Sequence, residues 1–97
     1  MISNLKIVRQ KLKLKSRLEV ISQIQSRVHE LSSLEDEYSK FSCKIAMAIL
    51  QNLNYVKNEN DLLNLIERLN NFALNQEDPE KTSIVTQITS ALLQIKI

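Results

Sequence analysis

The sequence has no glycine and only one proline, Pro79, among its 97 residues. Glycine supplies the positive-φ positions of tight hairpin turns and of many helix C-caps, so its absence argues against a β-sandwich or a β-barrel. A chain with one proline also has few forced helix breaks. The composition therefore predicts an all-α protein with long helices.

Cysteine and aromatic residues are scarce. Because Cys43 is the only cysteine, no disulfide can form within the chain, and we expect an intracellular, reducing compartment, either the cytoplasm or the nucleoid or nucleus. No apolar run approaches the roughly 18 residues of a transmembrane helix. Aromatic residues make up 4% of the chain, so leucine and isoleucine are expected to fill the core.

No residue pattern indicates catalysis, a cofactor or a metal site. His29 is the only histidine and has no partner at metal-ligand spacing, while Cys43 lies in an apolar stripe without a nearby base. The acidic clusters at 35–37 and 77–80 fall where helix N-termini are expected, and capping explains them. We therefore expect a protein that is not an enzyme, with no cofactor, no metal and no small-molecule substrate.

Charge is divided unevenly along the chain. Residues 1–34 carry seven Lys or Arg and two acidic residues, a net charge of +5, whereas residues 35–97 carry six and nine, a net charge of −3. Residues 1–23 also resemble a mitochondrial presequence in being basic and amphipathic, but we expect this segment to be retained. The imbalance predicts a basic N-terminal arm on a mildly acidic body.

Hydrophobic spacing and capping residues predict one domain over residues 1–97, a small antiparallel bundle of about four helices. The first is a long basic helix over 1–31, in which Ile7, Leu14, Ile21 and Val28 repeat every seven residues like a coiled-coil seam. The alternation in 11–15 would also fit a strand, but its five residues lack turn signals and favour helix. The other helices are expected at 34–57, 61–74 and 79–95.

The stretch 43–53 is apolar nearly all round, which is typical of a central buried helix. We expect Ile45, Ile49, Leu50 and Leu53 to be among the most buried residues. The side chains predicted to pack around them are Phe41, Leu69, Phe72, Ile88 and Leu92.

Basic residues recur along the first predicted helix at spacings that gather them on its surface. They are Lys6, Arg9, Lys13 and Arg17 on one face, flanked by Lys11 and Lys15 on the opposite side. This spacing fits contact with phosphates or with an acidic partner, and it equally fits a solvated face. No aromatic residue alternates with the lysines, which argues against stacking on single strands. No recognition-helix signature of base-reading side chains is evident either, so any nucleic-acid contact would be independent of sequence.

The same predicted helix carries surplus apolar surface. The residues expected at a protein interface are Leu5, Val8 and Leu12 on one side and Ile7, Leu14 and Ile21 on the seam. A helix with two apolar faces and a basic stripe would also fit a membrane surface, but the seam continues past the charged part, so protein contact is favoured over a membrane.

The length of this predicted helix bears on its partners. About 29 residues at 1.5 Å each span ~44 Å, whereas a 100-residue globule has a radius of gyration of about 13 Å. The helix must therefore bend, break or project. A projecting apolar seam would require a homo-oligomer or another protein to cover it.

These patterns predict a non-enzymatic accessory subunit that binds a larger protein assembly through its helices, within nucleic-acid-processing machinery for replication or transcription. The alternative is a sequence-independent DNA- or RNA-binding protein that uses the basic N-terminal helix.

Overall fold

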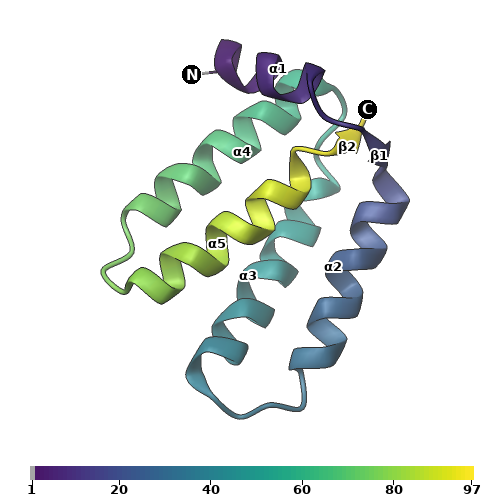
Figure 1. Ribbon diagram of the computed structural model, residues 1–97. Helices are drawn as coiled ribbons and strands as arrows, with labels where there is room; N and C mark the ends of the chain where they lie inside the picture. Colours follow the sequence, from purple (N-terminus) through teal and green to yellow (C-terminus); the bar gives the residue numbers. More distant parts are fainter. Residues whose placement is uncertain (1) are drawn as a thin grey trace.

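The computed structural model describes residues 2–97, with side chains from residue 4 onward, and this part of the chain is mostly helical (Figure 1). Its helices are α1 (Ile2–Gln10), α2 (Arg17–Leu31), α3 (Glu37–Leu53), α4 (Glu59–Leu74) and α5 (Pro79–Leu92). Two short strands, β1 (Lys15–Ser16) and β2 (Ile95–Lys96), pair in parallel. The prediction of an all-α protein is confirmed, although the described helices number five rather than four.

The prediction of one long N-terminal helix over 1–31 is wrong, because the chain leaves the helix after Gln10. The amides of Lys11 and Leu12 donate to the carbonyls of Val8 and Arg9, each at 3.1 Å, and close a last turn. The chain then runs extended to Ser16, whose side chain accepts a hydrogen bond from the amide of residue 19 and caps α2. The N-terminal helix is therefore short.

The break also overturns the choice of helix over strand for residues 11–15. Lys15 pairs with Ile95 in the register of β1 and β2, and its amide donates to the carbonyl of Gln94 at 2.7 Å. The pairing covers only two residues in each strand, so it does not change the fold class. The alternation of lysine and leucine was the sequence signal for this extended segment.

Capping residues place the starts of the later helices. Asp36, Asn58 and Asp78 each accept a backbone hydrogen bond as the N-cap of α3, α4 and α5, and Pro79 occupies the first turn of α5. Because Asp36 is the cap of α3, that helix spans 37–53 instead of the predicted 34–57. Helix α4 begins at 59 rather than 61, and α5 ends at 92 rather than 95, because 95–96 form β2.

The helices pack as two antiparallel pairs joined through α3 and α5. Helix α2 packs on α3, α4 packs on α5, and α3 packs on α5, while α1 lies against α4 (Figure 1). The radius of gyration is 13.2 Å, as expected for a compact chain of this length. Within residues 2–97, therefore, no helix projects from the body (Figure 1).

The hydrophobic core contains buried side chains from α2, α3, α4 and α5. Ile49 and Leu53 are each 1% exposed, which confirms the prediction that α3 is buried along this face, and Leu92 is fully buried. Ile45 and Leu50 are only partly buried. Further fully buried side chains, outside the predicted core, lie on α2, α4, α5 and β2, and they are Val20, Leu62, Leu63, Ile66, Val85 and Ile95.

Two predictions about packing are wrong. Phe72 is 41% exposed rather than packed into the core. The prediction that the seam projects is wrong for its later part, since Ile21 and Val28 pack against the core of the same chain, whereas Ile7 and Leu14 are exposed. Breaking the helix lets α2 fold back onto α3, which covers this part of the seam.

Candidate interaction surfaces

Arg9 faces the interior of the protein. Its side chain is 4% exposed, and Nη1 donates to the carbonyl oxygens of Leu93 at 2.7 Å and Ile95 at 2.8 Å. Nη2 lies 3.6 Å from Oε2 of Glu59, which is half exposed. The last carbonyls of a helix lack partners within the helix, so Arg9 satisfies the C-cap carbonyl of α5 at Leu93 and also binds the strand that follows it, at Ile95.

Arg17 likewise donates hydrogen bonds to backbone carbonyls at the end of α3 and in the turn after it. Its Nη1 donates to the carbonyl of Leu53 at 3.3 Å, and its Nη2 donates to the carbonyl of Val56 at 2.7 Å. A fork of N–H donors suits two neighbouring carbonyls, which a lysine could not match. Arg17 therefore anchors the start of α2 to the turn that follows α3.

The sequence contains no glycine that could cap these two helix ends. Helix C-termini commonly end in a left-handed glycine whose amide satisfies the last carbonyls. In the described residues no backbone φ is positive, so this kind of cap does not occur there. Arginines near the ends of α5 and α3 supply donors instead. The signal in the sequence was therefore the lack of glycine together with arginines in the N-terminal segment.

The predicted basic face is accordingly divided, and the prediction that four cations share one helical face is wrong. Arg9 and Arg17 turn inward, whereas Lys6 and Lys13 are exposed on α1 and on the extended segment. The two flanking residues also differ, since Lys11 is exposed and Lys15, within β1, is half-buried.

The residues predicted to form two apolar faces at a protein interface are not separated in that way. Leu5 and Ile21 pack against the core, and Leu12 is half-buried. The remaining three are exposed on the outside of the N-terminal segment, and they are Ile7, Val8 and Leu14. The six residues therefore do not form the two predicted faces.

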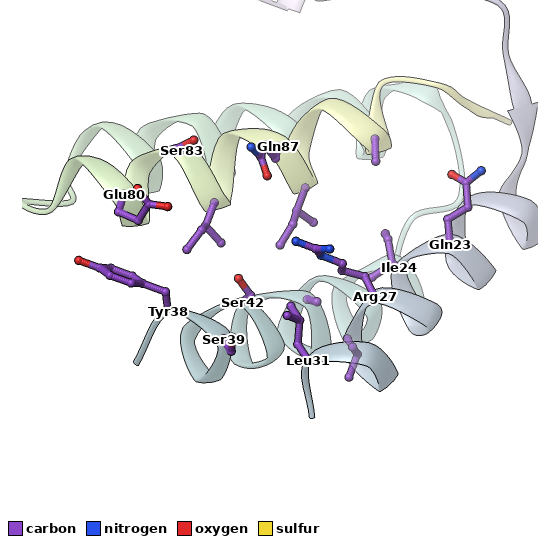
Figure 2. Close-up of a pocket in the computed structure, with 15 residues that line it drawn as sticks. Gln23, Ile24, Arg27, Leu31, Tyr38, Ser39, Ser42, Glu80, Ser83 and Gln87 are labelled. Carbon is purple, nitrogen blue, oxygen red and sulfur yellow. The ribbon is translucent and has the colours of Figure 1, made fainter. Parts of the chain in front are cut away.

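The structure instead contains an open groove between α2 and α5, with α3 as its floor (Figure 2). Its volume is about 480 Å³. Helices α2 and α5 both pack on α3 but touch each other little, which leaves the space between them open. Small side chains of α3 line the floor at helical spacing, namely Ser39, Ser42 and Ala46, and they make the groove deep.

The walls of this groove are apolar and its rim is polar. The wall residues are Ile24, Val28 and Leu31 from α2 and Ile84, Ile88 and Ala91 from α5. The rim residues are Gln23, Arg27, Tyr38, Glu80, Ser83 and Gln87. In Figure 2, Tyr38 and Glu80 lie at one end of the groove and Gln23 at the other. An apolar trough with polar edges is the usual shape of a peptide-binding groove.

Polar contacts tie the starts of α3 and α5 together at the Tyr38 end. The Tyr38 hydroxyl donates to Oδ2 of Asp78 at 2.7 Å, and Lys81 Nζ lies 2.9 Å from Oε1 of Glu37. The first hydrogen bond raises the pKa of Tyr38 and lowers the pKa of Asp78, and the pair with Glu37 raises the pKa of Lys81. These contacts hold one end of the groove at a set width.

Stability is expected to fall in acid because of two caps. Hydrogen bonds from Ser39 lower the pKa of Asp36, and hydrogen bonds from Tyr38 and from the Glu80 amide lower the pKa of Asp78. Acid therefore protonates these carboxylates in the unfolded chain first, which favours unfolding. Their contribution should be complete above the usual carboxyl pKa of about 3.9 and be lost as pH falls below it.

Urea unfolding at pH 6 and pH 3 measures this effect. The double variant Asp36→Asn and Asp78→Asn should be less stable than the natural sequence at pH 6 and should lose less stability on acidification. An equal loss in the double variant and in the natural sequence would contradict the assignment.

The remaining candidate chemistry is sparse. Within residues 2–97, no cluster of three or more His, Cys, Asp or Glu side chains is placed to hold a metal ion. Cys43 is half-buried, with its Sγ 3.7 Å from the carbonyl of Val28. Over the same residues, no helix has both the length and the hydropathy needed to cross a bilayer.

The fold and groove thus define a small all-α protein with an open interhelical trough. No protein-family model matches the sequence, and comparisons with curated proteins and with solved structures find no match.

Proposed function

We propose that this protein is a non-enzymatic interaction subunit that binds an amphipathic helix of a larger protein in the groove between α2 and α5. The observation that supports the proposal is the groove itself, an apolar trough left open beside a well-filled core. Amphipathic helices dock in such troughs through apolar residues at i, i+3, i+4 and i+7.

The dimensions favour a helix over a small molecule. From Glu80 to Ala91, α5 borders the groove over a length of ~16 Å at about 1.5 Å per residue, which equals about three turns of a docked helix. The lining residues come from α2, α3 and α5 and extend over several turns of these helices rather than enclosing a single point (Figure 2). The small floor residues would let the backbone of a docked helix approach α3 closely.

The alternative of sequence-independent DNA or RNA binding has less support. It required one basic helical face, and the two arginines of that face bind backbone carbonyls inside the protein. The groove is therefore the better candidate for the functional site.

Site-specific photo-crosslinking in the native cell tests the proposal. A photoreactive residue in place of exposed Ser83, on the rim, should capture an amphipathic helical segment that mass spectrometry can identify. The same residue in place of exposed Asn71, on α4 and outside the groove, should not capture it.

A variant that fills the groove provides the second half of this test. Ser42→Trp should lower the affinity for a synthetic peptide of the captured segment by at least about tenfold, or about 1.4 kcal/mol. Its thermal melt should show that the protein still folds, since overpacking costs roughly 1–3 kcal/mol. Unchanged affinity in a folded Ser42→Trp protein, or equal capture from Ser83 and Asn71, would refute the proposal.

A further inference from the structure

The three contacts made by the N-terminal segment gather distant parts of the chain at one end of the molecule (Figure 1). Arg9 binds the carbonyls that follow α5, Arg17 binds those at the end of α3, and β1 pairs with β2. In the strand register Ser16 lies beside Lys96, so the lysines of residues 11–15 are joined there by a lysine from the opposite end of the chain.

Exposed apolar side chains lie close to these lysines in sequence. Leu14 and Ile97, which are 36% and 48% exposed, adjoin β1 and β2, and Leu18, which is 79% exposed, lies in the first turn of α2. We use the name basic end for the surface formed by Lys11, Lys13, Lys96, Leu14, Leu18 and Ile97.

The charge of the basic end is largely uncompensated. Lys11, Lys13 and Lys96 are exposed, and within the described side chains none of them pairs with a carboxylate. The nearest acidic residue in sequence is exposed Glu19, and Glu59 is paired with Arg9. The surface therefore presents positive charge and apolar side chains together.

An anionic lipid surface satisfies both kinds of side chain. Its headgroups attract lysine, and the boundary between headgroups and acyl chains accepts leucine. A nucleic-acid duplex would satisfy the lysines but leave Leu14 and Leu18 in water. Protein contact was favoured over a membrane because the apolar seam continues past the charged residues. The later part of that seam, at Ile21 and Val28, packs within the chain, so it no longer supports protein contact.

Acidic residues at the opposite end of the molecule also favour an arrangement in which the basic end faces an anionic lipid surface. Glu35 and Glu77 precede α3 and α5, Glu37 and Glu80 lie in the first turns of these helices, and the pair of Glu37 with Lys81 places the two helix starts together. A negatively charged membrane would repel this acidic end and attract the basic end. We infer that the basic end binds the surface of bilayers containing anionic phospholipids, with Leu14 and Leu18 inserted at headgroup depth.

Vesicle co-sedimentation of the full chain tests this inference. Binding is expected to phosphatidylcholine vesicles containing about 30% phosphatidylglycerol, and not to phosphatidylcholine alone, because the lysines need anionic headgroups. Raising the salt from ~50 to ~500 mM should weaken it, because salt screens exposed charges. Equal binding to both vesicles, no binding at ~50 mM salt, or binding to duplex DNA without binding to vesicles would overturn the inference.

Charge variants separate the basic end from overall charge. Lys11→Glu with Lys13→Glu should lower the partition coefficient by roughly 25-fold or more, about fivefold for each charge removed. The control Lys40→Glu with Lys44→Glu makes the same change in net charge on exposed residues of α3 and should reduce binding much less. Equal losses in the two double variants would overturn the assignment of the site.

Leu18 has a well-matched control in Leu74, which is also 79% exposed but lies at the end of α4. Since the chain has no tryptophan, Leu18→Trp and Leu74→Trp each give a single fluorescent reporter. Emission from residue 18 should shift to the blue on adding the anionic vesicles, while emission from residue 74 should not. No shift at residue 18, or an equal shift at both, would contradict insertion. None of these substitutions touches the groove, so the groove experiment succeeds or fails separately.

Discussion

Replacing Arg9 by alanine is expected to lower the free energy of unfolding by about 3 kcal/mol, a large share of the roughly 5–15 kcal/mol typical of a small domain. The guanidinium is almost fully buried and donates to the carbonyls of Leu93 and Ile95. Hydrogen bonds from a charged donor contribute roughly 1.5–3 kcal/mol each, and their loss leaves acceptors unpaired. The packing of α1 on α4 and the pairing of β1 with β2 should weaken together.

Urea unfolding of Arg9→Ala measures this loss against two controls. Lys6→Ala removes an exposed cation from the same helix and should change stability by no more than about 0.5 kcal/mol. Arg9→Lys keeps the charge but lacks the planar fork, so it should lie between Arg9→Ala and the natural sequence. Equal stability of Arg9→Ala and Lys6→Ala would contradict the capping role of Arg9.

Replacing Ile49 by alanine is expected to cost roughly 2–5 kcal/mol. Ile49 is 1% exposed at the centre of α3, among side chains from α2, α4 and α5, so truncation removes buried surface and leaves a cavity. For a chain of this size each kcal/mol corresponds to a fall in melting temperature of roughly 4–8 °C. Differential scanning calorimetry measures this shift directly.

Met47 provides the matched control on the same helix. It is 54% exposed, two residues before Ile49, and Met47→Ala should leave the melting temperature within a few degrees of the natural value. A melt of Ile49→Ala that coincides with that of Met47→Ala would show that this face of α3 is not the core.

The two proposed surfaces lie on different parts of the molecule and would bind their partners through different interactions. The groove offers apolar walls over a floor of small residues, so its affinity depends on shape and on buried area. The basic end offers exposed lysines with a few leucines, so its affinity depends on salt and on anionic lipid. If both proposals hold, the protein would bring a partner helix to a membrane surface.

The sequence by itself determined the fold class and the start of α5, and it placed the starts of α3 and α4 within about one helical turn of their positions. Without glycine, the tight turns of a β-sheet protein had no suitable residues, and Asp36, Asn58 and Asp78 had the side chains that cap helices. The buried face of α3 at Ile49 and Leu53 was also predicted correctly from its apolar residues, but the expectation that this helix is buried nearly all round was wrong, since Met47 is 54% exposed. These are local properties, set by residues within one or two turns of each other.

Only the tertiary structure decided where the first helix ends and what its arginines do. Arg9 finds its carbonyl acceptors 84 and 86 residues away, and Arg17 finds its acceptors 36 and 39 residues away. Spacing along a helix cannot reveal such partners. Breaking the helix after Gln10 costs a few local hydrogen bonds, and the contacts of Arg9 and Leu5 with distant parts of the chain offset that cost.

The same reason applies to both candidate surfaces. The groove lies between α2 and α5, and the basic end joins Lys96 to Lys11 and Lys13, so residues far apart in the chain form each of them. Periodicity predicts which face of a helix is apolar, but not which helix will cover that face. Long-range packing decides this, because the free energy of burying each face depends on the shape of every other element.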